Sequence, residues 1–202
     1  MKFTMMLLLA VTAAVLAGCG GSPKVNYYTL ATAEIDEAAP EPTGANGYTI
    51  AVGPVGLPEL VDRPQLVVRV GANEVVLVEE HRWAESLASS IPRLIAEHLT
   101  RLLHAQQVSA YPESVIGKAD YRVIVDIQRF DSEIHGAATI DAIWTIHRVA
   151  QKDAQNRTGH SLVREPTGDD TYPALVAAHS RALLAVSRDI AVAIRSYSSP
   201  QR

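Results

Sequence analysis

The sequence holds a single cysteine, Cys19, so no disulfide framework can form within the chain. An excess of positive charge is also absent, because 18 basic and 22 acidic residues give a formal net charge of −4 at pH 7. A nucleic-acid partner would call for a clustered basic face, so we expect none. Beyond the N-terminal segment, no apolar run approaches the roughly 20 residues that span a bilayer. We therefore expect no transmembrane helix in the mature chain.

Familiar catalytic motifs are missing as well. The sequence has no Gly-x-Ser-x-Gly turn, no Gly-rich phosphate loop ending in Lys-Ser or Lys-Thr, and no His-Glu-x-x-His pair. Glu79, Glu80 and His81 could be an acid/base or metal cluster, but we interpret them as a solvated charged edge, because adjacent residues of an extended segment do not converge on one ion. We interpret His98 as a half-buried packing residue, and Trp83 and Trp144 as core residues. We expect no catalytic site, no metal and no cofactor.

The N-terminus has the order of an export signal, with a basic start and an apolar run from residue 5 to residue 16. The run ends with Leu16, Ala17, Gly18 and Cys19. These residues resemble the lipobox of bacterial lipoproteins at all four positions. The resemblance implies cleavage before Cys19 and acyl chains on this residue, which together would form a stable membrane anchor. The alternative is an ordinary signal peptide whose cleavage site contains a cysteine.

Gly20 follows the expected lipidated cysteine. In lipoproteins of two-membrane bacteria an aspartate at this position favours retention in the inner membrane, so Gly20 indicates the inner leaflet of the outer membrane. We divide the chain into a signal peptide over residues 1–18, a lipidated tether over 19–47 and a domain over 48–198. The tether is expected to contain one short strand, over 26–30, and a mobile loop over 31–47.

Hydrophobic periodicity in the domain predicts strands, a helix, further strands and a second helix. We expect strands over 49–55, 66–70, 74–78, 121–128, 138–147 and 157–164, and a short segment near Val108. Helical spacing covers 84–104 and about 169–196. Pro92 interrupts the first helix, so either that helix kinks or Ser90 caps a second helix. This order predicts an α+β fold, with a mixed β-sheet covered by two helices in a single domain.

Four segments together have a distinctive sequence: Tyr27–Leu30, Ile50–Val55, Leu57–Val67 and Arg82–Leu87. They resemble the ABC-type transport auxiliary lipoprotein family, which includes the lipoprotein of the paraquat-inducible transport system. The resemblance extends over most of the mature chain.

The resemblance implies a non-enzymatic subunit of a system that moves lipids or other hydrophobic molecules between the two membranes. Its implied partner is a periplasmic protein with an MCE (mammalian cell entry) domain. We also expect a homo-oligomer, because a small domain that meets a symmetric partner gains from matching its symmetry. The alternative is a structural or assembly lipoprotein of the envelope that binds another periplasmic protein.

The segment from Gly56 to Gln65 is an apolar connection stiffened by prolines. Its apolar side chains either fold back onto the core or offer a contact surface, and the sequence leaves both possibilities open. The candidate residues for binding a partner or for fixing this loop are Leu60, Asp62, Arg63, Pro64, Gln65, Arg82 and Trp83.

Overall fold

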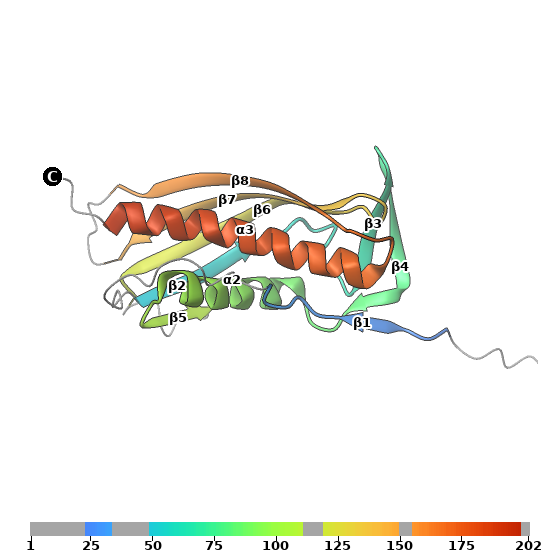
Figure 1. The fold of residues 1–202 in the computed structure, drawn as a ribbon, viewed down its shortest axis with the longest axis horizontal. Helices are drawn as coiled ribbons and strands as arrows, with labels where there is room; N and C mark the ends of the chain where they lie inside the picture. The colour runs from blue at the N-terminus through green and yellow to red at the C-terminus, as the bar shows by residue number, and fades with distance from the viewer. Residues whose placement is uncertain (1–22, 34–48, 111–118, 150–154, 199–202) are drawn as a thin grey trace, which may run out of the picture.

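The computed structural model describes residues 23–33, 49–110, 119–149 and 155–198. In this part of the chain the strands form two mixed sheets beside two helices (Figure 1). The smaller sheet has the order β1-β4-β3 and comprises β1 (Asn26–Tyr28), β3 (Gln65–Gly71) and β4 (Glu74–Trp83). The larger sheet has the order β5-β2-β6-β7-β8 and comprises β2 (Thr49–Gly56), β5 (Gln107–Ala110), β6 (Tyr121–Ser132), β7 (Ala137–Arg148) and β8 (Arg157–Pro166). The helices are α2 (Leu87–Leu103) and α3 (Tyr172–Ser198). The predicted α+β fold is confirmed, with its strands divided between two sheets.

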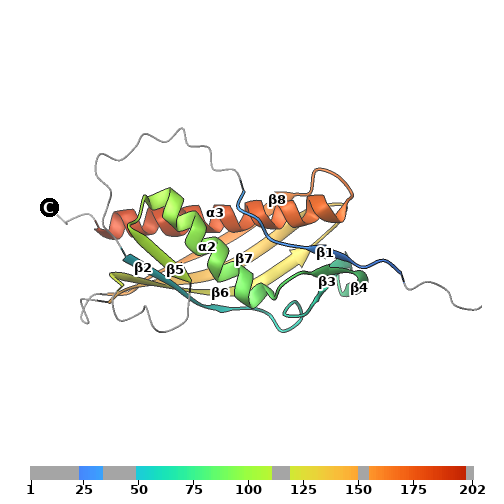
Figure 2. The same cartoon turned by 90° about the horizontal axis from the view of Figure 1, so that it is seen from below.

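One face of the larger sheet forms the core together with both helices (Figures 1 and 2). Helix α2 packs against β2 and β5, α3 packs against β7 and β8, and the two helices contact each other. Alternate residues of β6 and β7 are buried, among them Val123, Val125, Ile140 and Ile146. The residues between them lie on the opposite face, which leaves Ile143 exposed. The period of two in the sequence therefore reflects a sheet that is covered on one side.

The helices begin at short polar residues. Ser86 occupies the N-cap position of α2, and Pro92 lies in the second turn of this one continuous helix. A separate helix capped by Ser90 is therefore excluded, because the Ser90 hydroxyl donates to the Ser86 carbonyl at 3.2 Å. Helix α3 follows Thr171, whose hydroxyl accepts a hydrogen bond from the Ala174 amide at 3.3 Å. Neither helix is long and apolar enough to cross a membrane, and the same holds for all residues that the structure describes.

Two histidines are fully buried between the helices and the sheet. Nδ1 of His98 lies 3.1 Å from the Ser187 hydroxyl, which links α2 to α3. Nε2 of His179 lies 2.8 Å from the hydroxyl of Ser132 on β6. His98 is thus fully buried rather than half-buried as predicted, because the helix face that carries it packs against α3. Burial lowers the pKa of His98 to about 4 and that of His179 to about 3.

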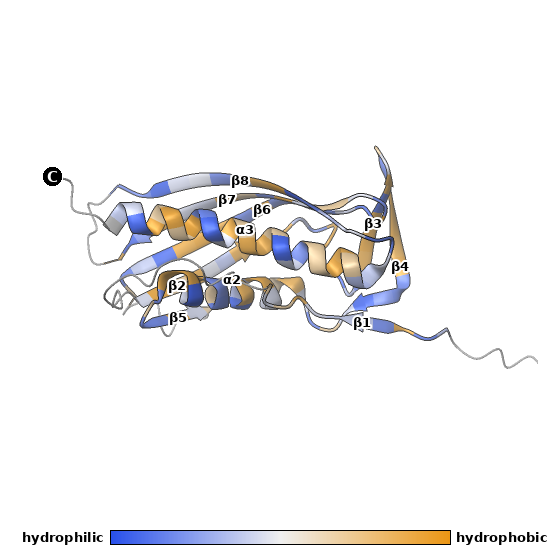
Figure 3. Cartoon of the chain, viewed as in Figure 1, coloured by the Kyte–Doolittle hydropathy of each residue, from blue (hydrophilic) through white to orange (hydrophobic). Residues whose placement is uncertain are grey.

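The β3–β4 hairpin projects from one end of the molecule, which is also the end that carries β1 (Figure 1). The hairpin predicted over 66–78 is confirmed, but β4 continues to Trp83. A register shift places Gln65 opposite Arg82 and the next residue, Leu66, opposite Val78. The additional residues of β4 allow its end to pair with β1 on the other side. Apolar residues cover much of the projecting part (Figure 3).

Candidate functional site

The two most distinctive runs of the sequence meet where β3 begins and β4 ends. Gln65 pairs with Arg82, and the Trp83 amide donates to the Pro64 carbonyl at 2.7 Å. The Gln65 amide and the Arg82 guanidinium both donate to the Glu79 carboxylate, at 3.2 and 2.9 Å. Pro64, Gln65 and Arg82 are therefore engaged in hydrogen bonds at this junction. These bonds favour a role of the three residues in fixing the loop.

Trp83 lies inside the core at this junction. Its ring packs edge-on against Phe130 and His179, with centroid distances of 6.3 and 6.4 Å. The rings of Phe130 and His179 stack at 4.0 Å and are nearly parallel. Trp83 is therefore a packing residue that joins the smaller sheet to β6 and α3.

Strand β1 is attached to the same junction. It runs parallel to the end of β4, and the Ala84 amide donates to the Tyr28 carbonyl at 2.8 Å. The Tyr28 hydroxyl lies 2.7 Å from Nδ1 of His81, and the His81 ring stacks on Tyr172 at 3.7 Å. Two aromatic rings and a histidine thus connect β1 and β4 to the start of α3.

The predicted tether enters the domain at this strand. Its strand over 26–30 is confirmed in part, since β1 covers Asn26–Tyr28. The predicted lipidation, cleavage and sorting residues lie outside the described residues: Leu16, Ala17, Gly18, Cys19 and Gly20. Most of the loop predicted over 31–47 also lies outside them.

The connection between β2 and β3 forms a compact turn. The amides of Val61 and Asp62 both donate to the Pro58 carbonyl, at 3.0 and 3.3 Å. Val61 is buried, whereas Leu60 has 43% of its surface exposed. Arg63 is half-buried, and the Asp62 side chain lies in solvent. Neighbouring residues of this loop therefore differ, because Val61 folds back onto the core and Leu60 is exposed.

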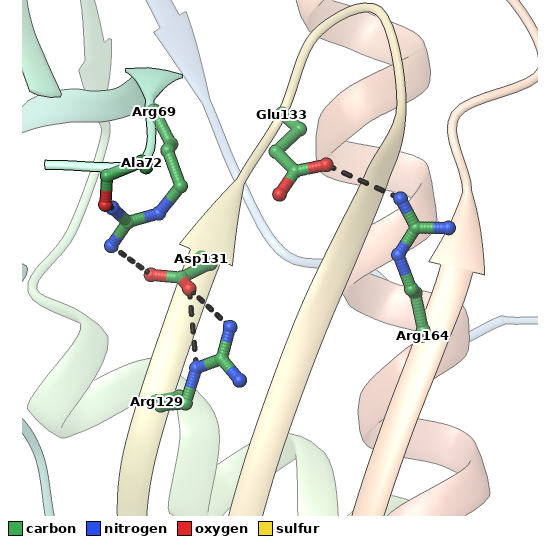
Figure 4. Close-up of polar contacts among 6 residues, drawn as sticks. All are labelled: Arg69, Ala72, Arg129, Asp131, Glu133 and Arg164. Atoms are coloured by element: carbon green, nitrogen blue, oxygen red, sulfur yellow. Dashed lines mark hydrogen bonds and ion pairs between the residues drawn. The ribbon is translucent and has the colours of Figure 1, made fainter. Parts of the chain in front are cut away.

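Asp131 and two arginines fix the hairpin to the larger sheet (Figure 4). The guanidinium of Arg69 on β3 lies 3.0 Å from one oxygen of Asp131 on β6, and Arg129 lies 2.7 Å from the other. Arg69 also donates to the Ala72 carbonyl at 3.2 Å, which closes the hairpin turn. Partial burial would raise the pKa of Asp131, but hydrogen bonds and charge from both arginines outweigh it and lower this pKa.

The described residues contain no group of three or more His, Cys, Asp or Glu side chains placed to hold a metal ion. Glu79 and Glu80 are exposed, as predicted for a solvated edge. His81 differs, because it is half-buried between Tyr28 and Tyr172.

Comparison with protein families identifies this arrangement. Residues 28–191 match the model of the ABC-type transport auxiliary lipoprotein component family. The chain belongs to this family. It is accordingly an auxiliary component of a transport system and a lipoprotein associated with the cell envelope.

The crystal structures of two proteins share the fold of this auxiliary lipoprotein. A crystal structure of an uncharacterized protein superposes with a TM-score of 0.68 at 17% identity, covering 85% of this chain and 99% of the other. A Xanthomonas campestris protein of the DUF330 family also gives a TM-score of 0.68 at 17% identity, covering 87% and 100%. A PelC dodecamer from Paraburkholderia phytofirmans gives 0.46 at 11% identity, covering 73% and 91%. Comparison with curated protein sequences gives no match.

Sequence reasoning missed two features of the auxiliary lipoprotein. One is the stack of Tyr28, His81 and Tyr172, which joins residues far apart in the chain. The other is the ion pair of Arg69 with Asp131. These residues occupy ordinary strand and helix positions, so the sequence does not show which of them meet. The only local signal is on β6, where the charged Arg129 and Asp131 alternate with the apolar Phe130.

Proposed function

We propose that this auxiliary lipoprotein is a non-enzymatic subunit of an MCE-type system that transports lipids or other hydrophobic molecules between the inner and outer membranes. In this proposal acyl chains on Cys19 attach it to the periplasmic face of the outer membrane, and its domain docks with the MCE-domain protein. The family match over residues 28–191 carries the proposal. The exposed Leu60, on a hydrogen-bonded turn, supplies a candidate contact for the partner.

The anchor is tested by replacing Cys19 with Ala. We expect the Cys19→Ala protein to remain an unprocessed precursor and to incorporate no labelled fatty acid, because the thioether cannot form. In a parallel culture, wild-type protein should sediment with outer membrane on a sucrose gradient. The Gly20→Asp protein should sediment with inner membrane instead. Label in the Cys19→Ala protein, or wild-type protein found mainly in the inner membrane, would contradict the anchor or the sorting.

Docking is tested by Leu60→Asp, with Leu162→Asp as a matched control. Both leucines are exposed, at 43% and 60%, but Leu162 lies on β8 of the larger sheet. Because Leu60 is already in solvent, we expect Leu60→Asp to change the melting temperature little. We also expect it to weaken recovery of the MCE-domain protein in a pull-down, whereas Leu162→Asp leaves recovery intact.

Two results would count against this contact. Equal recovery with both variants would remove Leu60 from the interface. A large fall in melting temperature for Leu60→Asp would show that the turn needs this side chain for folding. A partner without an MCE domain, recovered with wild type, would favour the structural or assembly lipoprotein instead.

A further inference from the structure

The β3–β4 hairpin exposes aliphatic side chains next to its turn. Val70, Val76 and Leu77 are all exposed, with 57% of the Val70 surface in solvent. Val76 and Leu77 are neighbours in β4, so they point to opposite faces of the hairpin. Val68, farther from the turn, is buried against residues of β7 and α3. The apolar strands therefore extend beyond the part of the hairpin that the domain covers (Figure 3).

The exposed part of the hairpin has a fixed position. Arg69 bonds to Asp131 on β6 and to the Ala72 carbonyl within the turn (Figure 4). Both partners of the ion pair are largely shielded from solvent, which strengthens the contact. The exposed apolar side chains thus lie on a hairpin that Arg69 attaches to the larger sheet.

The chain that leads to the proposed anchor starts at this end of the molecule. Strand β1 pairs with residues 81–83 of β4, and both lie opposite the C-terminal end (Figures 1 and 2). Asn26 follows Cys19 by seven positions, and seven residues reach at most about 25 Å. Because β1 is fixed to the domain, this short reach keeps the hairpin end close to the bilayer that holds the acyl chains.

We infer that the exposed end of the β3–β4 hairpin, which carries Val70 and, on opposite faces, Val76 and Leu77, contacts end-on the lipid surface in which the protein is anchored. The inference rests on the proposed anchor at Cys19. A weak apolar contact is sufficient, because the tether keeps the hairpin at high effective concentration near the membrane. Glu74 and Glu80 on the same hairpin are also exposed, so the contact suits a zwitterionic surface better than an anionic one.

The single cysteine makes a direct test possible. Cys19 is acylated in the anchored protein, so one introduced cysteine is the only free thiol. We would label full-length lipidated Val70→Cys with an environment-sensitive fluorophore and reconstitute it in phosphatidylcholine vesicles that contain nitroxide-labelled lipid. Val192→Cys is the matched control, because Val192 has 62% of its surface exposed and lies near the C-terminal end of α3.

The expected result is a blue-shifted emission and severalfold stronger quenching at position 70 than at position 192. Leu77→Cys should behave like Val70→Cys, which guards against a local effect of one label. Equal and weak quenching at all three positions in protein that floats with the vesicles would overturn the hairpin contact and leave the anchor intact. Failure to float would contradict the anchor itself. A blue shift that depends on protein density without lipid quenching would show a contact between copies and overturn the inference.

Discussion

Trp83 and Leu60 lie in neighbouring parts of the sequence that carry the family resemblance, but they differ in environment. Trp83 is enclosed by Phe130 and His179, whereas Leu60 lies in solvent on a hydrogen-bonded turn. A change at Trp83 would therefore act on folding, whereas in the proposed docking a change at Leu60 would act on binding.

The two buried histidines predict a pH dependence of stability. Their pKa values in the folded protein, about 4 for His98 and about 3 for His179, lie below the ordinary value of about 6.5. At a pH between the folded and the ordinary pKa of each histidine, its side chain is protonated in the unfolded chain but not in the folded one. The free energy of unfolding therefore falls as the pH falls below about 6.5. Each histidine contributes a slope of at most about 1.4 kcal/mol per pH unit.

Urea denaturation at pH 7 and pH 5 measures this effect, and His98→Gln should reduce the difference between the two midpoints. Asp131 acts in a separate range, because its lowered pKa stabilises the fold above its ordinary pKa and loses that contribution only in stronger acid. Equal unfolding midpoints at pH 7 and pH 5 would contradict the burial of both histidines.

At the scale of elements, the pairing of β7 with β8 depends on a glycine. Gly159 lies opposite Trp144, and a Cβ at Gly159 would come within 2.2 Å of the indole ring. The ring is also held by a hydrogen bond from its Nε1 to the Ser161 hydroxyl at 3.0 Å, so it has little freedom to move.

We expect Gly159→Ala to lower the free energy of unfolding by about 1–3 kcal/mol, because the added methyl group overpacks this contact. Gly71→Ala is the control, since a Cβ there meets its nearest neighbour at an ordinary 3.5 Å. Thermal and urea denaturation of both variants provide the measurement. Similar stability of Gly159→Ala and wild type would show that the Trp144 ring does not pack as described.

The sequence predicted most elements because their cores are locally periodic. Strands β6 and β7 alternate over most of their length, and α3 has capping residues before an apolar stripe. The end of β4 was missed, because the charged run after Val78 breaks the alternation although the strand continues to Trp83. The division into two sheets was also missed, since it depends on which distant strand each segment meets. For the candidate site, the resemblance indicated the motif residues, but the exposure of Leu60 depends on the tertiary packing around the turn.

At the scale of the whole molecule, the described residues have distinct ends. The hairpin and β1 occupy one end, and the C-terminal part of α3 occupies the other (Figure 1). The larger sheet and both helices connect these ends through one core. This arrangement is compatible with the proposed function, in which a membrane holds the subunit at one end and a partner meets the rest of its surface.

We propose above that this auxiliary lipoprotein is an outer-membrane subunit that docks with an MCE-domain protein. Native mass spectrometry of complexes purified from membranes through the full-length lipoprotein tests it most directly. We predict a complex that contains the MCE-domain protein and more than one copy of the lipoprotein, because matching the symmetry of the partner multiplies each weak contact. Recovery of the lipoprotein as a monomer, or only with proteins that lack an MCE domain, would contradict the claim.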